Sequence, residues 1–286
     1  MLMIEGPKFP GYDFSPRASQ LAERQDLEPF VIKGHRVVLP SRTDELQSSQ
    51  LQQEGANHES ETLKQKDEQP LSHTASTAKS VWDCSIVLGK YMEALEDKTP
   101  GYWSNKNVLE LGAGQGIVSL SAAALGVSKV IVTDVSTALP DLQEGVQLNG
   151  FTENNVHVVE LDWTSRDLAV HHISENLLGQ EKSLDFILAS DVVWVDYLVP
   201  HLVDTIADLM KLRSSQGSSP TLLLAYQVRS LRSDRVLFES LDKLGLKREK
   251  VRFDGGSDAD NSNFSVFLDF DFRKPDLAIW RFWKEE

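Results

Sequence analysis

The sequence is poor in cysteine, in long apolar runs and in positive charge. A single cysteine, Cys84, occurs among 286 residues, so no disulfide can form within the chain, and such a composition is typical of a reducing compartment. No apolar run approaches the roughly 20 residues that a membrane-spanning helix needs. The first residues, MLMIEGPKFPGYDF, lack the basic region and apolar core of a secretory signal. We therefore expect a soluble protein of the cytoplasm, with the nucleus as a second compartment and no membrane partner.

Acidic residues outnumber basic ones, 43 to 29, which gives a formal net charge of -14. This charge repels phosphate backbones, and no basic, aromatic-rich segment provides a local exception. We therefore expect no nucleic-acid partner and predict a protein substrate with a basic or lysine-bearing surface. His171 and His172 are adjacent, without a third ligand at metal-site spacing, so no metal is expected. We expect the protein to be a monomer.

From residue 80 onward, strand-like and helix-like segments alternate. Strands are predicted at 107–111, 129–134, 155–161, 184–190 and 221–228, and helices at 116–125, 138–148, 167–178, 197–212 and 234–244. Alternation with short connections predicts an α/β fold, a doubly wound, mostly parallel sheet with helices on both faces. Two late segments, 246–253 and 277–283, are predicted to pair at the sheet edge, which makes seven strands.

The region before residue 80 has a different composition. Residues 1–42 form an N-terminal extension, in which PFVIKGHRVVLPS (29–41) predicts two short β segments around Lys33 and Gly34. Residues 43–79 consist largely of Gln, Ser, Glu and Asp. Because so few apolar side chains cannot offset the entropy lost on ordering, this stretch is predicted to be a disordered insertion. An amphipathic helix beginning near Ser80 then opens the main domain, 80–286.

The segment ELGAGQG follows the first predicted strand of this domain and precedes a helix. Three glycines, Gly112, Gly114 and Gly116, permit a tight turn and, together with Ala113, let the backbone approach a ligand closely. In a doubly wound sheet this loop lies where ligands bind. Glu110 brings a carboxylate to the turn, which favours a cationic ligand over a pyrophosphate.

Asp134 stands at the end of the second predicted strand, in KVIVTD. Because parallel strands end at the same sheet edge, this carboxylate is expected to reach a ribose hydroxyl pair. The glycine turn and the acid together predict a bound nucleoside. An NAD-dependent oxidoreductase shares both features and remains an alternative, although GAGQG lacks the G-x-G-x-x-G spacing of dinucleotide enzymes.

The motifs in their order, ELGAGQG, TD, ELDW and ASDVVW, resemble those of the seven-β-strand S-adenosylmethionine-dependent methyltransferases. VWDCSIVLGKYME, ahead of the glycine turn, is similar to the protein-lysine methyltransferases that carry a W-D pair before the fold and a D-x-x-Y/F motif after the fourth strand. The resemblance covers roughly residues 80–250. It implies a Rossmann-like class I methyltransferase domain at 80–286, S-adenosylmethionine as cofactor, and transfer of methyl to a lysine of a non-histone protein.

The resemblance also implies roles for individual residues. Trp163 would flank the adenine, Trp82 would close over the cofactor, and Ser190 would belong to the cofactor site. Asp191 would orient the acceptor amine, which is almost wholly protonated when free at neutral pH; the plain alternative is a helix cap. Trp194 would line the acceptor channel, in a place where the family usually has Tyr or Phe.

Three further alternatives stay open. AYQVRS (225–230), with ASDV, also resembles a sister group linked to arginine methylation, so arginine remains a candidate acceptor. Within that segment Arg229 is predicted to be a surface arginine at the sheet edge, with substrate contact as the other interpretation. The unusual Trp194 also leaves open a scaffold that binds the cofactor without catalysis.

Overall fold

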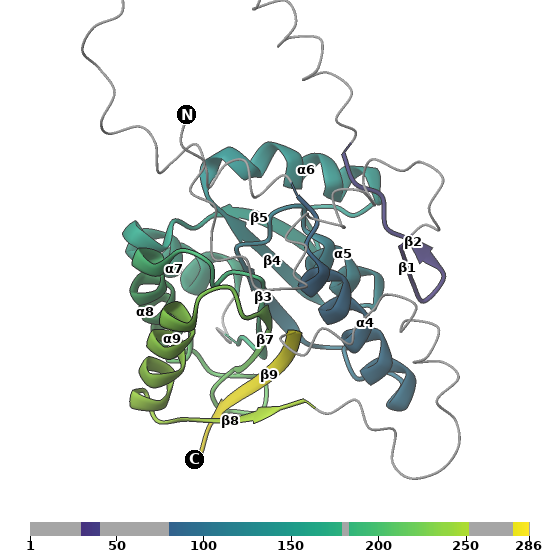
Figure 1. Ribbon diagram of the computed structural model, residues 1–286. Helices are drawn as coiled ribbons and strands as arrows, with labels where there is room; N and C mark the ends of the chain where they lie inside the picture. The colour runs from purple at the N-terminus through teal and green to yellow at the C-terminus, as the bar shows by residue number, and fades with distance from the viewer. Residues whose placement is uncertain (1–29, 41–79, 179–182, 252–276, 286) are drawn as a thin grey trace, which may run out of the picture.

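The computed structural model describes residues 30–40, 80–178, 183–251 and 277–285. Its centre is a seven-stranded sheet in the order β5-β4-β3-β6-β7-β9-β8 (Figure 1). The strands are β3 (Asn107–Leu111), β4 (Lys129–Asp134), β5 (Val156–Glu160), β6 (Phe186–Ser190), β7 (Thr221–Gln227), β8 (Leu246–Lys250) and β9 (Leu277–Lys284). The predicted fold class is therefore confirmed. The predicted insertion, 43–79, lies outside the described residues.

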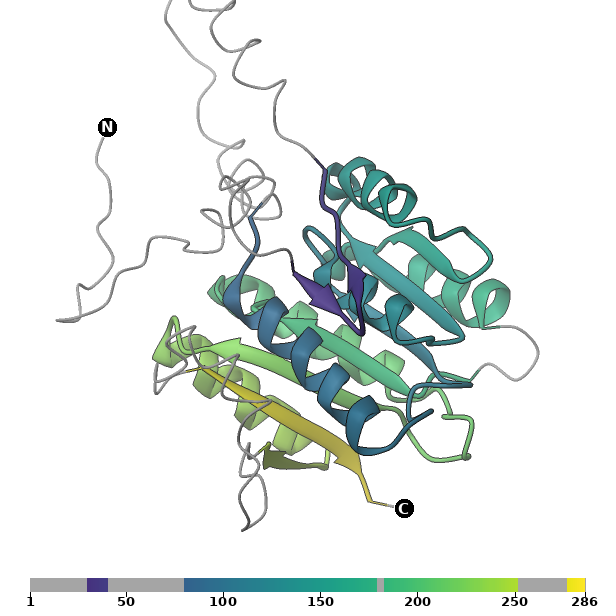
Figure 2. The ribbon, with the colours of Figure 1, turned by 90° about the vertical axis from the view of Figure 1, so that its right-hand side faces the viewer.

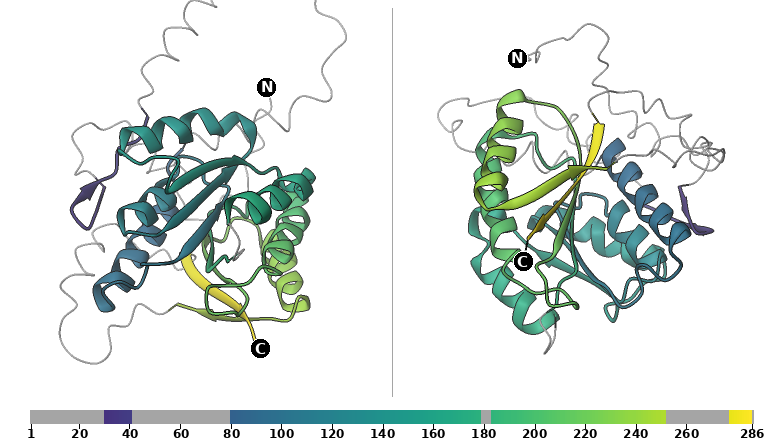
Figure 3. Two further views of the ribbon diagram at one scale, coloured as in Figure 1. Left: turned by 180° about the vertical axis from the view of Figure 1, so that it is seen from behind. Right: turned by 90° about the horizontal axis from the view of Figure 1, so that it is seen from below.

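The strands β3 to β7 are all parallel, and β9 runs antiparallel to both of its neighbours, β7 and β8 (Figure 3). The predicted late pairing is thus confirmed, with β8 at the outer edge. Leu109 of β3 is in register with Ile131 of β4 on one side and Ile187 of β6 on the other. This pairing brings the carboxyl ends of the three central strands to one edge of the sheet.

Helices cover both faces of the sheet. One layer is formed by α4 (Asp83–Lys98), α5 (Ile117–Ala124) and α6 (Leu139–Leu148); the other by α7 (Asp167–His172), α8 (Val199–Leu209) and α9 (Leu231–Lys243). Single turns are η1 (Ser136–Ala138), η2 (Trp163–Ser165) and η4 (Asp196–Leu198), and a π-helical segment, η3 (Ile173–Leu177), continues α7. The helix predicted over 167–178 therefore changes its hydrogen bonding midway.

Two apolar cores lie on the two faces of the sheet. Successive strand residues point to opposite faces, so Leu109 packs in the core under α8 and α9, while Val108 packs in the core under α4 and α5. Trp103 is fully buried in the core under α4 and α5, where its indole N–H donates to the Met92 carbonyl at 2.8 Å. Both faces of the central strands are mainly apolar because both are covered.

The predicted N-terminal β segments form a hairpin, β1 (Val31–Ile32) and β2 (His35–Arg36). Its turn residues, Lys33 and Gly34, both have positive φ, at 49° and 78°, which is the geometry of a tight two-residue hairpin loop. The hairpin lies beside α4 (Figure 2), and the Lys90 ammonium on that helix donates to the Val31 carbonyl. The hairpin is therefore attached to α4.

One carboxylate is enclosed between β3 and α5. Glu110 is fully buried, and its Oε2 accepts hydrogen bonds from the backbone N–H of Ser119, at 2.9 Å, and from the Ser119 hydroxyl. Its Oε1 has no hydrogen-bond partner in the described part of the chain. Burial raises the pKa of Glu110 to about 8, although the Ser119 bonds act in the opposite direction.

Glu110→Gln should make the free energy of unfolding less dependent on pH. The folded chain keeps the Glu110 proton between the ordinary pKa of a glutamate and about 8, whereas the unfolded chain loses it. The stabilisation is therefore present at acid pH and is lost as the pH rises through about 8. Urea unfolding measures this at pH 5 and pH 8.5. Between these two pH values the free energy of unfolding should fall more for the wild type than for the variant, by at least about 1 kcal/mol.

The matched control is Glu144→Gln, which removes an exposed carboxylate on α6. That variant should follow the wild type at both pH values. Equal losses for wild type and Glu110→Gln would show that Glu110 does not hold a proton in the folded chain.

Candidate functional site

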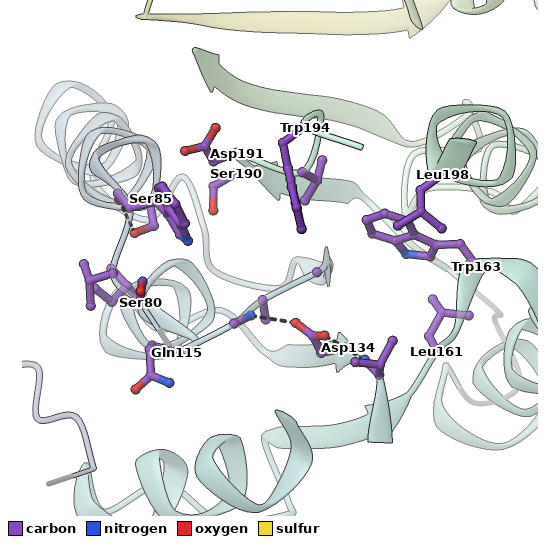
Figure 4. Close-up of a pocket in the computed structure, with 18 of the residues that line it drawn as sticks. Ser80, Ser85, Gln115, Asp134, Leu161, Trp163, Ser190, Asp191, Trp194 and Leu198 are labelled. Carbon is purple, nitrogen blue, oxygen red and sulfur yellow. Dashed lines mark hydrogen bonds between the residues drawn. The ribbon is translucent and has the colours of Figure 1, made fainter. Parts of the chain in front are cut away.

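A cavity opens at the carboxyl ends of the central strands (Figure 4). Every predicted site residue lines it except Glu110 and Gly116; those that do are Trp82, Gly112, Ala113, Gly114, Asp134, Trp163, Ser190, Asp191 and Trp194. Figure 4 shows Asp134 and Leu161 on one side of the open space and Asp191 and Trp194 on the other. The loops after β3, β4, β5 and β6 therefore converge on one cavity, and the start of α4 reaches it as well.

The glycine turn is closely packed against the loops beside it. A Cβ on Gly112 would lie 2.9 Å from Cγ1 of Val192 and 3.1 Å from Cζ2 of Trp163, and its φ is 61°. Both the backbone conformation and the lack of space therefore require glycine at this position. Gly116 serves the fold instead: it has a φ of 74° immediately before α5, and a Cβ there would meet Leu142.

Asp134 connects the end of β4 to the glycine turn. Its Oδ2 accepts a hydrogen bond from the Gly114 N–H at 2.8 Å, and its Oδ1 accepts one from the Val135 N–H at 2.7 Å. Burial raises the pKa of Asp134, while these two hydrogen bonds lower it. Each carboxylate oxygen has a second lone pair, which leaves acceptor capacity for hydroxyl groups in the cavity.

An apolar slot lies next to Asp134. Trp163 begins η2 directly after the loop from β5, where Asp162 caps the turn by accepting from the Thr164 N–H at 2.8 Å. Leu161 and Leu198 line the cavity near the indole of Trp163 (Figure 4). A flat aromatic ring between aliphatic side chains is a suitable site for a planar heterocycle.

Asp191, the first residue after β6, is held by its backbone and by its side chain. Its φ of 56° is uncommon for a residue other than glycine, although Asp tolerates this region better than most. Its backbone N–H donates to the Ala225 carbonyl of β7 at 2.9 Å. Both carboxylate oxygens accept from the Arg229 guanidinium, Oδ1 from Nε at 2.8 Å and Oδ2 from Nη2.

The structure corrects two sequence-based expectations. Arg229 is not a surface arginine: only 20% of its side chain is exposed, and it is paired with Asp191. Glu110 does not present its carboxylate to the cavity, because the carboxylate lies beneath α5 against Ser119. Lining residues that sequence reasoning did not single out include Ser80, Val81, Ser85, Gln115, Ile117, Val135, Val192 and Leu198. Of these, Gln115 stands within the glycine motif itself.

Within the described ranges, no three His, Cys, Asp or Glu side chains are grouped as a metal site would require. No helix among those ranges combines the length and apolar character needed to cross a bilayer. The polar side-chain groups of the lining residues are carboxylates, hydroxyls, indole N–H groups and the amide of Gln115. Their chemistry is suited to an organic ligand.

Comparison with known proteins gives a family and several relatives. A family model described as lysine methyltransferase matches residues 58–244. Methyltransferase-like protein 23 of Dictyostelium discoideum is 29% identical, over 59% of this chain and 67% of its own length. Protein N-lysine methyltransferase METTL21A of Danio rerio is 32% identical, over 62% of this chain and 72% of its own length. EEF1A lysine methyltransferase 3 of Xenopus tropicalis is 30% identical, over 57% of this chain and 64% of its own length.

Solved structures also resemble the chain, at low identity. Magnesium protoporphyrin IX methyltransferase (ChlM) from Synechocystis PCC 6803, with bound SAH, aligns with a TM-score of 0.45 and 12% identity, over 85% of this chain and 96% of the other.

The family model spans more than half of the chain and includes the glycine turn, Asp134, Trp163 and Asp191. The chain therefore belongs to the family of S-adenosylmethionine-dependent lysine methyltransferases.

Proposed function

We propose that this protein transfers a methyl group from S-adenosylmethionine to a lysine side chain of a non-histone protein, at the cavity between Asp134 and Asp191. The observation that carries the proposal is the convergence of two kinds of group on one cavity. Gly112, Asp134 and Trp163 form the kind of set that holds a nucleoside, and all three line the cavity. Asp191 and Trp194 line the same cavity, across the open space from Asp134 (Figure 4).

The residues around Asp134 and Trp163, at the nucleoside end of the cavity, fit the cofactor. Asp134 offers acceptor lone pairs for the ribose hydroxyls, and Trp163 with Leu161 offers an apolar slot for the adenine. Because Gly112 has no Cβ, its backbone can pack directly against Val192 and Trp163 beside this slot. When bound, S-adenosylmethionine supplies a methyl group made electrophilic by the positive charge on its sulfur.

The second end fits a cationic or amine acceptor. Trp194 lines the cavity with an aromatic ring, whose face can hold an ammonium or methylammonium group by cation-π attraction. Asp191 lies three residues earlier on the same loop. Methyl transfer is a direct displacement, so the main tasks of the protein are to align the amine and to receive it unprotonated. Both tasks can be performed by groups at this end of the cavity.

The proposal is tested by incubating the protein with a cell lysate and radiolabelled S-adenosylmethionine, followed by mass spectrometry of the labelled proteins. A labelled lysine would support it; label on arginine alone would favour the sister group linked to arginine. One relative is named as an EEF1A lysine methyltransferase, so recombinant EEF1A is a defined acceptor to include. No label on any protein, despite measured cofactor binding, would favour a non-catalytic scaffold.

Asp134→Asn should weaken the binding of S-adenosylmethionine by roughly 10- to 100-fold, because a hydrogen bond to a charged group is worth about 1.5 to 3 kcal/mol. Isothermal titration calorimetry measures the change. Glu160→Gln is the matched control, since Glu160 is an exposed acid paired in register with Asp134 on the neighbouring strand. Equal affinity of Asp134→Asn and wild type would remove Asp134 from the cofactor site.

Asp191→Asn should lower methyl transfer by about 100-fold, in the range typical of a positioned acid-base group, while cofactor affinity stays within about threefold. Asn is preferred to Ala because it also tolerates the positive φ at this position. Turnover is measured with the labelled acceptor and affinity by calorimetry. Asp167→Asn, an exposed acid on α7, is the control. Unchanged turnover in Asp191→Asn would show that Asp191 has no part in transfer.

A further inference from the structure

Arg229 joins two residues that line the cavity. Its guanidinium makes a bidentate pair with Asp191 and lies over the indole of Trp82, with Cζ 4.7 Å from the ring centroid. Asp191 and Trp82 come from different elements, the loop after β6 and the residue that precedes α4. Arg229 itself is not among the lining residues, so it supports the acceptor end of the cavity from behind.

Asp191 and Arg229 form an ion pair of opposite unit charges, and most of both side chains is buried. The Asp191 side chain is 2% exposed and that of Arg229 is 20% exposed. Burial would lower the pKa of Arg229, but its hydrogen bond and charge interaction with Asp191 outweigh this and raise it. Guanidinium groups do not lose their proton in proteins, so the cation opposite Asp191 is permanent.

Among the described residues, two further titratable groups that act on this pair lie in α4. Cys84 is fully buried, and burial raises the pKa of its thiol well above the ordinary value, so it contributes no charge at neutral pH. Asp83, at the first position of α4, also interacts electrostatically with Arg229. In the described part of the chain, the guanidinium that pairs with Asp191 is that of Arg229, which also interacts with Asp83. The charge that the acceptor meets at this end of the cavity therefore depends on Arg229.

We infer that Arg229 is a positioning residue of the transfer site, which holds the Asp191 carboxylate in place and cancels its charge, so that an acceptor amine beside Asp191 binds as the neutral nucleophile. The inference rests on the function proposed above. A bidentate guanidinium uses one lone pair of each carboxylate oxygen and leaves the second available to accept from the amine. Asp191 can therefore align the acceptor without strongly favouring its charged form.

The chemistry of transfer explains why the charge matters. The amine lone pair forms the new N–C bond, the S–C bond breaks with its electron pair left on sulfur, and the product is a methylammonium that later gives its extra proton to water. An ammonium has no lone pair for this step. A carboxylate within about 4 to 6 Å favours the ammonium form, and a neutralised carboxylate does so less. Arg229 thus extends activity to lower pH.

Arg229→Gln should move the acid limb of the pH–rate profile up by about one pH unit, which lowers the rate at neutral pH by about tenfold and restores most of it at high pH. The rate is measured between pH 6.5 and 10 in single turnover, with enzyme in excess over the acceptor protein labelled in the lysate assay. With the enzyme also at a saturating concentration, the rate constant reports the bound amine and does not depend on the concentration of either protein.

Three companion variants separate charge from structure. Arg229→Lys keeps the charge and should keep the limb within about 0.3 pH units of wild type. The double variant, Asp191→Asn with Arg229→Gln, removes both charges. Its acid limb should lie at the wild-type pH, although its rate should be lower throughout. Arg235→Gln, which removes an exposed arginine paired with Glu239 on α9, is the control and should change nothing.

A uniform fall in rate at all pH values with an unmoved limb would mean a purely structural role and would overturn the inference. If Arg229→Gln does not fold, Asp191→Asn alone tests the same balance in the opposite direction: the uncompensated guanidinium should move the limb down by about one unit, and an unmoved limb overturns the inference. Failure of the proposed function is distinguishable, because wild-type protein would then label no acceptor at all.

Discussion

The parallel pairing of β3 with β4 on one side and β6 on the other is the constraint on which the site depends. This pairing places Glu110 opposite Val132 and Leu188, and so brings the next few residues of each chain segment to the same edge. Asp134, Asp191 and the glycine turn belong to three chain segments that the sheet brings together. The hydrogen bond from Gly114 to Asp134 forms because β3 and β4 are paired, and Asp191 reaches the same edge through the pairing of β3 with β6. The backbone ladder thus fixes the separation between the nucleoside end of the cavity and the acceptor end.

Much of this arrangement can be predicted from the sequence because its signals are local. Val, Ile and Leu runs mark strands that are covered on both faces, and the glycine spacing marks the turn after β3. Asp134 follows directly from its position at the end of KVIVTD, since the carboxyl ends of parallel strands share an edge. The resemblance to lysine methyltransferases, based on these motifs in order, is confirmed by the family match over residues 58–244.

The placement of Glu110 was wrong for a reason that the sequence does contain. Side chains alternate along a strand, so Glu110 shares a face with Val108 and not with Leu109 or Leu111. Val108 packs in the core that α4 and α5 cover, and Glu110 accordingly meets Ser119 of α5 beneath the helix. Proximity to the glycine turn in sequence suggested a ligand contact, whereas the strand period places the carboxylate on the helix side.

Arg229 could not be placed from its sequence, because its role depends on the register between β6 and β7. Ser190 is opposite Ala225, which brings the residues that follow both strands side by side. Register is set by tertiary packing rather than by any single motif, so AYQVRS alone gives an arginine near a sheet edge and no partner.

Once the register is known, the pairing of Asp191 with Arg229 can be explained by burial. A carboxylate only 2% exposed requires a buried partner, since an unpaired charge in such a place is strongly disfavoured. Arg229 meets that requirement with two hydrogen bonds, and its guanidinium also lies over the indole of Trp82. The positive φ of Asp191 is then maintained by its neighbours on both sides, through Ala225 on the backbone and Arg229 on the side chain. A residue fixed at so many points is suited to align a substrate, because little of its freedom is left to lose when the substrate binds.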